Sequence, residues 1–202
     1  MSINIFWDNS NIMWVGRNFS MLHEPGHEKD FRIYFRNLLQ FAVNNRVISY
    51  AFMAGSTPPQ NDSLWQYFKK LGVDVKIQER GILTNKEIAV DEAIHTKMLE
   101  RIVDVKTPET IVLLTGDGNG YAQGKGFIKQ LERALENHWQ IEVISWSVGC
   151  SKDLKKFASL YGTYKELDPV YDSVTFTNDR IVRPLPPLYD SIACQLHDGA
   201  DK

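Results

Sequence analysis

The chain has 202 residues, of which 43% are hydrophobic and 24% are charged. This composition excludes a disordered or fibrous protein, and the length predicts one domain that can bury its own core. The net charge of −2 excludes binding to nucleic acid through an overall positive field, so such a site needs a local basic patch. The two cysteines, Cys150 and Cys194, lack the spacing of a metal site or a disulfide framework. The sequence shows neither a signal-peptide pattern nor a membrane-spanning apolar run, so we expect a cytoplasmic or nuclear protein.

Short apolar runs alternate with amphipathic helical patterns along the chain. The runs predict strands at 3–7, 47–53, 73–77, 111–114 and 140–145. The helical patterns cover about 30–42, 61–71, 86–103, 126–138 and 151–160, and Asp30 is the expected cap of the first of these helices. A polar loop is predicted at 16–29. This alternation predicts an α/β fold, a three-layer α/β/α sandwich with a mostly parallel central sheet. We expect that domain to span residues 1–167, and the proline-containing tail 168–202 to pack on it or on a partner.

Acidic and amide side chains follow two of the predicted strands. Asp8, Asn9 and Asn11 come directly after the first strand, and Asp117 lies between two glycines after the strand 111–114. Because ligands bind at the carboxyl ends of parallel strands, these residues predict a site at that edge of the sheet. Turns in which Asp and Asn bind their own backbone are the alternative interpretation.

A third acidic position lies on the predicted helix 86–103. Glu87, Asp91 and His95 are spaced four apart and therefore share one face of that helix. Neighbouring carboxylates repel unless a cation lies between them, although a solvated helix face is the alternative. If Asp8, Asp91 and Asp117 converge, their oxygens suit Mg²⁺ or Mn²⁺, which can activate a water for attack on a phosphodiester.

Three motifs together resemble the NYN domain, a branch of the PIN-like nucleases. They are Trp7-Asp8-Asn9-Ser10-Asn11, Val90-Asp91-Glu92-Ala93 and Leu113-Leu114-Thr115-Gly116-Asp117-Gly118, within a similarity that runs from about residue 3 to 157. The resemblance implies a parallel α/β/α sandwich, an acidic pocket for Mg²⁺ or Mn²⁺ and endoribonuclease activity. It also implies that Asp8, Asp91 and Asp117 bind the metal, and that Asn11 orders the pocket or contacts the scissile phosphate.

We therefore expect a metal-dependent endoribonuclease that cuts single-stranded RNA. Its catalytic and metal-binding residues are Asp8, Asp91 and Asp117, and its expected substrate-binding residues are Asn9, Asn11, Asn119, Arg17, Lys86 and Lys125, with Lys129 as a further phosphate contact. Many relatives carry acids where this chain has Asn119 and Lys97, so a catalytically degenerate RNA-binding or scaffold module stays an alternative. A phosphatase is a third hypothesis, and Ser10 argues against its commonest aspartyl-phosphate form. A homodimer paired through the tail also stays open.

Overall fold

A computed structural model describes residues 2–57, 63–79 and 88–186 of the chain. Its centre is a six-stranded sheet in the order β4-β3-β1-β5-β6-β7, in which every neighbouring pair is parallel. The strands are β1 (Ser2–Asp8), β3 (Val47–Thr57), β4 (Asp74–Glu79), β5 (Thr110–Leu114), β6 (Gln140–Ser145) and β7 (Thr163–Glu166). The predicted α/β class and its five strands are confirmed, and β7 adds an edge strand that the sequence pattern did not reveal.

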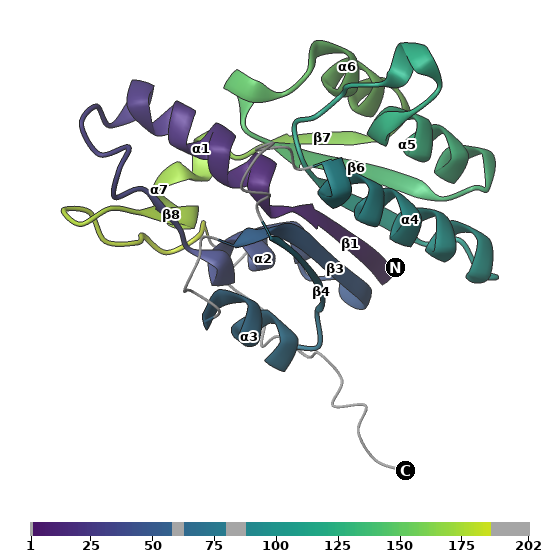
Figure 1. The fold of residues 1–202 in the computed structure, drawn as a ribbon, viewed down its shortest axis with the longest axis horizontal. Helices are drawn as coiled ribbons and strands as arrows, with labels where there is room; N and C mark the ends of the chain where they lie inside the picture. The colour runs from purple at the N-terminus through teal and green to yellow at the C-terminus, as the bar shows by residue number, and fades with distance from the viewer. Residues whose placement is uncertain (1, 58–62, 80–87, 187–202) are drawn as a thin grey trace.

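Two layers of helices cover the sheet (Figure 1). The first layer, α4 (Ile88–Asp104), α5 (Gly126–Glu136) and α6 (Lys152–Tyr161), packs on strand residues such as Phe6 and Leu113. The second, α2 (Phe35–Val43) and α3 (Ser63–Lys70), packs on the alternate strand residues, such as Trp7 and Leu114. Because successive side chains of a strand point to opposite faces, one run of apolar residues supplies both cores. No helix in the described ranges is long and apolar enough to cross a membrane.

Helix α1 (Asn9–His23) corrects the predicted polar loop at 16–29. The helix lies beyond the end of β1 and packs on residues that are distant in sequence. The indole of Trp146 donates a hydrogen bond to the carbonyl of Ile12 (2.9 Å), and the rings of Phe19 and Trp146 stack at 5.4 Å. These tertiary contacts stabilise helix where the local apolar pattern is weak, a common reason for a local prediction to fail.

The start of the second predicted helix is also corrected. Helix α2 begins at Phe35 rather than at Asp30, because Arg32–Ile33 form strand β2. This strand pairs with β8 (Thr175–Phe176) in a separate antiparallel sheet. Asp30 caps no helix; its carboxylate instead accepts the backbone N–H of Asn178 (2.9 Å).

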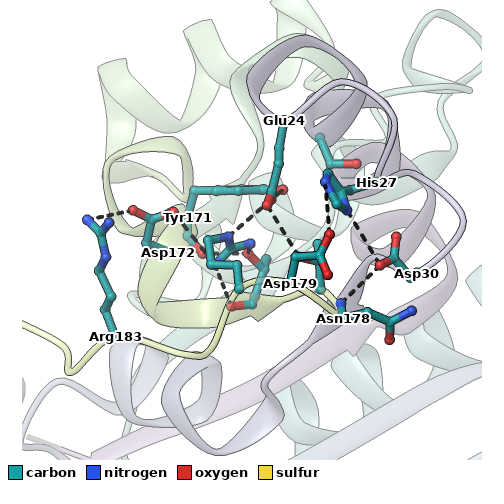
Figure 2. A network of polar contacts seen from close by, with 12 residues as sticks. Glu24, His27, Asp30, Tyr171, Asp172, Asn178, Asp179 and Arg183 are labelled. Carbon is teal, nitrogen blue, oxygen red and sulfur yellow. Dashed lines mark hydrogen bonds and ion pairs between the residues drawn. The ribbon is translucent and has the colours of Figure 1, made fainter.

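The described part of the predicted tail, residues 168–186, packs on the domain. It comprises the turn η3 (Asp168–Val170), the short helix α7 (Tyr171–Val174) and β8, and it places Tyr171 and Leu185 in the core around α1 and α2. A polar network joins this segment to the residues after α1 (Figure 2). In it the Arg180 guanidinium binds Glu24 (3.0 Å) and lies 4.7 Å from the centre of the Tyr171 ring.

Candidate functional site

The candidate site begins at the carboxyl ends of β1 and β5, the two central strands. In their parallel register Trp7 pairs with Leu114, so the next residues, Asp8 and Thr115, lie side by side. The Thr115 hydroxyl donates a hydrogen bond to Oδ2 of Asp8 (3.0 Å). Both residues are buried, with 3% of Asp8 and none of Thr115 exposed. The register therefore places the Asp8 carboxylate against the segment that leads to Asp117.

The carboxylate of Asp8 also caps α1. Its Oδ1 accepts the backbone N–H of Asn11 (3.0 Å), while Asp8 itself has the extended backbone of an N-cap residue. The side chain of Asn11 turns toward β5, where its Oδ1 accepts the backbone N–H of Gly116 (2.7 Å). The start of α1 and the loop after β5 are thereby joined by hydrogen bonds that come from the Asp8 and Asn11 side chains.

Asp117 lies two residues beyond Thr115 and is half-buried. Its backbone N–H donates to the Thr115 hydroxyl (3.2 Å), and its Oδ1 accepts the backbone N–H of Asn119 (2.9 Å). The Thr115 hydroxyl thus joins the Asp8 carboxylate, to which it donates, to the backbone of Asp117, whose N–H it accepts. Gly118 lets α6 approach, since a Cβ there would lie 2.3 Å from Oγ of Ser151. The sequence analysis did not single out Thr115, because its role depends on the pairing of β5 with β1.

Two other predicted residues lie at the same edge. Asn9 is the first residue of α1 and exposes only 8% of its surface, and its Oδ1 has no hydrogen-bond partner among the described residues. Asp91 lies in the first turn of α4 and is half-buried. Because α4 follows β4 and precedes β5, its amino end lies at the carboxyl edge of the parallel sheet.

His95 lies one turn beyond Asp91 on α4. Its ring packs edge-on against Phe127 at the start of α5 (4.5 Å), and its Nε2 is buried without a hydrogen-bond partner in the described chain. Burial lowers the pKa of His95, and the negative charges of Asp117 and Glu92 oppose that shift. The ring is therefore a packing contact between α4 and α5.

The donor set at this edge consists of oxygens, which suit a hard divalent cation. Across the described ranges no group of three or more His, Cys, Asp or Glu side chains is placed to hold one ion. Both oxygens of Asp8 already accept a hydrogen bond, but a carboxylate has further lone pairs. The residues therefore fit Mg²⁺ or Mn²⁺ only with few protein ligands, the remaining positions being filled by water or substrate phosphate, as is usual for Mg²⁺.

The basic residues predicted to contact phosphate differ in their exposure and in the partners that their side chains already have. Lys125 is exposed in the loop after β5, at the N-cap of α5. Lys129 forms an ion pair with Glu132 (2.6 Å), and Nε of Arg17 donates to the carbonyl of Glu28 (2.6 Å). Lys86 lies outside the described residues. Lys125 is therefore the predicted phosphate contact that the structure leaves exposed, in the loop that follows Asp117 along the chain.

Comparisons with known proteins agree with this geometry. The sequence profile of the NYN domain matches residues 2–163. No curated protein matches the chain. Among solved structures, a protein of unknown function from Vibrio parahaemolyticus is 13% identical, with 83% of this chain and 93% of that chain covered and a TM-score of 0.57. That likeness concerns the fold alone, whereas the profile match spans most of the sequence, and by it this chain belongs to the NYN domain family of the PIN-like superfamily.

Proposed function

We propose that this protein is a divalent-metal-dependent endoribonuclease that hydrolyses phosphodiester bonds in single-stranded RNA. One observation carries the proposal: Asp8 and Asp117 follow adjacent parallel strands, and the Thr115 hydroxyl between those positions donates to the Asp8 carboxylate and accepts the backbone N–H of Asp117. Membership in the NYN domain family supports a nuclease, since PIN-like nucleases typically use divalent metals.

In this proposal the chain's own residues bind and orient the reactants. Asp8 and Asp117 hold the cation, and Asp91 in the first turn of α4 adds negative charge at the same edge of the sheet. Thr115 fixes the orientation of Asp8, and Asn11 fixes the loop that carries Asp117. The unpartnered Oδ1 of Asn9 and the side chain of Asn119 position water or substrate, and Lys125 binds a neighbouring phosphate. Mg²⁺ or Mn²⁺, when bound, supplies positive charge for phosphate oxygens and raises the acidity of water.

The variant Asp8→Asn tests this proposal. Asparagine caps a helix about as well as aspartate, so the start of α1 and the fold should be retained. The site loses one negative charge, and we expect cleavage of a labelled RNA to fall by about 100-fold or more, since even indirect metal partners are worth about 10–100-fold. Asp104→Asn, an exposed acid at the other end of α4, is the matched control and should cut normally. Cleavage by Asp8→Asn at the wild-type rate would exclude the mechanism.

A second candidate is an RNA-binding module that has lost the reaction. It is favoured by the two hydrogen bonds that already occupy Asp8, by Asn119 in place of an acid, and by the lack of a three-acid group in the described chain. Thermal unfolding in Mn²⁺ separates the two candidates, because an ion that binds the native state raises its stability by about 2.7 kcal/mol at one hundred times Kd. A melting temperature unchanged by millimolar Mn²⁺ favours the module.

A further inference from the structure

Helix α1, which leads away from the end of β1 in Figure 1, carries an exposed tryptophan. The chain has five tryptophans, and four of them expose 2% of their surface or less, whereas Trp14 exposes 53%. Within the described ranges Trp14 has no ring contact, no hydrogen bond and no cation over its ring. By contrast, the exposed Tyr67, Tyr121 and Tyr161 each contact a neighbouring side chain. An exposed ring by itself identifies no ligand, so the surroundings of Trp14 decide what it can bind.

Trp14 lies next to the edge of the sheet that carries the acids. It is three residues beyond Asn11, so the two side chains are neighbours on the helix surface. The Asn11 side chain in turn accepts the backbone N–H of Gly116 (2.7 Å), beside Asp117. Along the helix axis Trp14 is only about 9 Å from Asp8, at about 1.5 Å for each residue. Since helical side chains lean toward the start of their helix, the indole leans toward the acids, and a strand bound there can reach it.

The charge of α1 suits an anionic ligand. The helix has 15 residues and none of them is Asp or Glu, although the whole chain carries 25 such residues. Arg17 is three residues beyond Trp14 and is therefore its neighbour on the helix surface. Its Nε donates to the carbonyl of Glu28 (2.6 Å), and the guanidinium forms no ion pair with any residue that the structure describes. An anionic chain that passes Trp14 thus meets a positive charge and no carboxylate of α1.

The neighbours of Trp14 favour a nucleobase over a protein partner. The four residues one turn before and after it on the helix surface are all polar: Ser10, Asn11, Arg17 and Asn18. The centre of a protein interface is more apolar than this. Unpaired bases, however, stack on a single aromatic side chain irrespective of sequence, and polar groups around the ring do not prevent this. A duplex keeps its bases stacked within the helix and cannot present a base to the ring.

We propose that Trp14 is a stacking platform for one base of a single RNA strand, next to the bond that Asp8 and Asp117 address. Trp14 is a substrate-binding residue in this proposal and takes no part in the chemistry. The inference rests on the proposed function, because it assigns a substrate contact of the same site.

The test measures binding without cleavage. The inactive parent is Asp117→Asn in EDTA, titrated into a labelled single-stranded RNA and followed by fluorescence anisotropy. In this background we expect Trp14→Ala to weaken binding roughly 5- to 150-fold, the range for one stacked base. Trp14→Phe keeps an aromatic face and should bind much closer to the parent. Because Trp14 is exposed and alanine is the best helix former, the fold of Trp14→Ala should be retained.

A second readout uses the fluorescence of Trp14 itself. The other four tryptophans are buried, so iodide in solution quenches mainly Trp14. A base stacked on the indole shields it, and we expect RNA to protect the parent from iodide. Equal quenching with and without bound RNA would overturn the platform.

Two exposed residues distant from the acids provide matched controls. Leu22 is 72% exposed and lies two turns beyond Trp14 on α1. Tyr161 is 56% exposed and ends α6 just before β7 begins, at the amino edge of the parallel sheet and opposite the acids. Leu22→Ala and Tyr161→Ala should leave binding unchanged, and binding of an RNA duplex should not respond to Trp14→Ala.

Several results would overturn the platform. They are equal binding by the parent and Trp14→Ala, equal losses in the two controls, or a loss of self-association in Trp14→Ala with RNA binding unchanged, which would identify a second copy as the partner. If the wild-type protein cuts RNA while Trp14→Ala binds normally, the platform alone is wrong. If the wild type cuts none while Trp14→Ala binds weakly, the nuclease proposal alone is wrong.

Discussion

The hydroxyl of Thr115 gives the sharpest test of how the two acids are held. Thr115→Val keeps the shape of the side chain and removes both of its hydrogen bonds, the one donated to the Asp8 carboxylate (3.0 Å) and the one accepted from the backbone N–H of Asp117 (3.2 Å). Asp8 is 3% exposed, so water cannot easily replace the lost donor. Hydrogen bonds to charged groups contribute about 1.5–3 kcal/mol, and we expect a loss of about 2–3 kcal/mol in the free energy of unfolding.

Urea unfolding at pH 7 measures this loss, and a thermal scan should show a melting temperature lower by about 4–12 °C for a domain of this size. Thr115→Ser retains the hydroxyl and is the matched control. Asp8→Asn removes the buried charge, so adding Thr115→Val to it should cost less than adding it to the wild type. A loss below about 0.5 kcal/mol for Thr115→Val, or an equal loss for Thr115→Ser, would refute the argument.

Two further predictions concern the C-terminal network and the loop after β5. Burial raises the pKa of Glu24, but the Arg180 guanidinium and hydrogen bonds from Tyr171 and Thr177 outweigh burial and hold that pKa below its ordinary 4.5. The ion pair between Glu24 and Arg180 therefore stabilises the fold above pH 4.5, and this stabilisation is lost as the pH falls and Glu24 takes up a proton. Arg180→Met should therefore flatten the fall in stability below about pH 4.5, and unchanged pH dependence in urea titrations would contradict this. Gly126→Ala combines a φ of +82° with a Cβ 2.0 Å from the Asn119 carbonyl, whereas Gly124→Ala has a φ of +69° and open space. The positive φ alone should cost Gly124→Ala about 1–3 kcal/mol of stability. We expect Gly126→Ala to lose more stability than that and to slow cleavage. Equal losses in the two variants would show that the contact between the new Cβ and the Asn119 carbonyl is relieved by a local shift.

The sequence predicted the central sheet because its strands are buried on both faces. Ile111–Leu114 is apolar throughout, and such a run between helical patterns indicates a strand of a parallel sheet. The acids could be placed at one edge for the same reason, since the carboxyl ends of parallel strands meet there.

What the local pattern could not predict depends on partners distant in sequence. The last turns of α1 are held by Trp146 and Tyr171, which lie more than one hundred residues further along the chain. Strand β2 exists because β8 pairs with it, and Thr115 gains its role only when β1 and β5 lie side by side. Lys86 and Glu87 fall outside the described residues, so their predicted roles stay predictions.

The nuclease assignment is tested most directly by cleavage of a labelled single-stranded RNA by wild type and by Asp117→Asn, each in Mn²⁺, Mg²⁺ or EDTA. We predict cutting by the wild type in one or both metals and none in EDTA, and a large loss of the metal-dependent cutting in Asp117→Asn. No cutting by the wild type in either metal, with the RNA still bound, would contradict the nuclease assignment and leave the RNA-binding module.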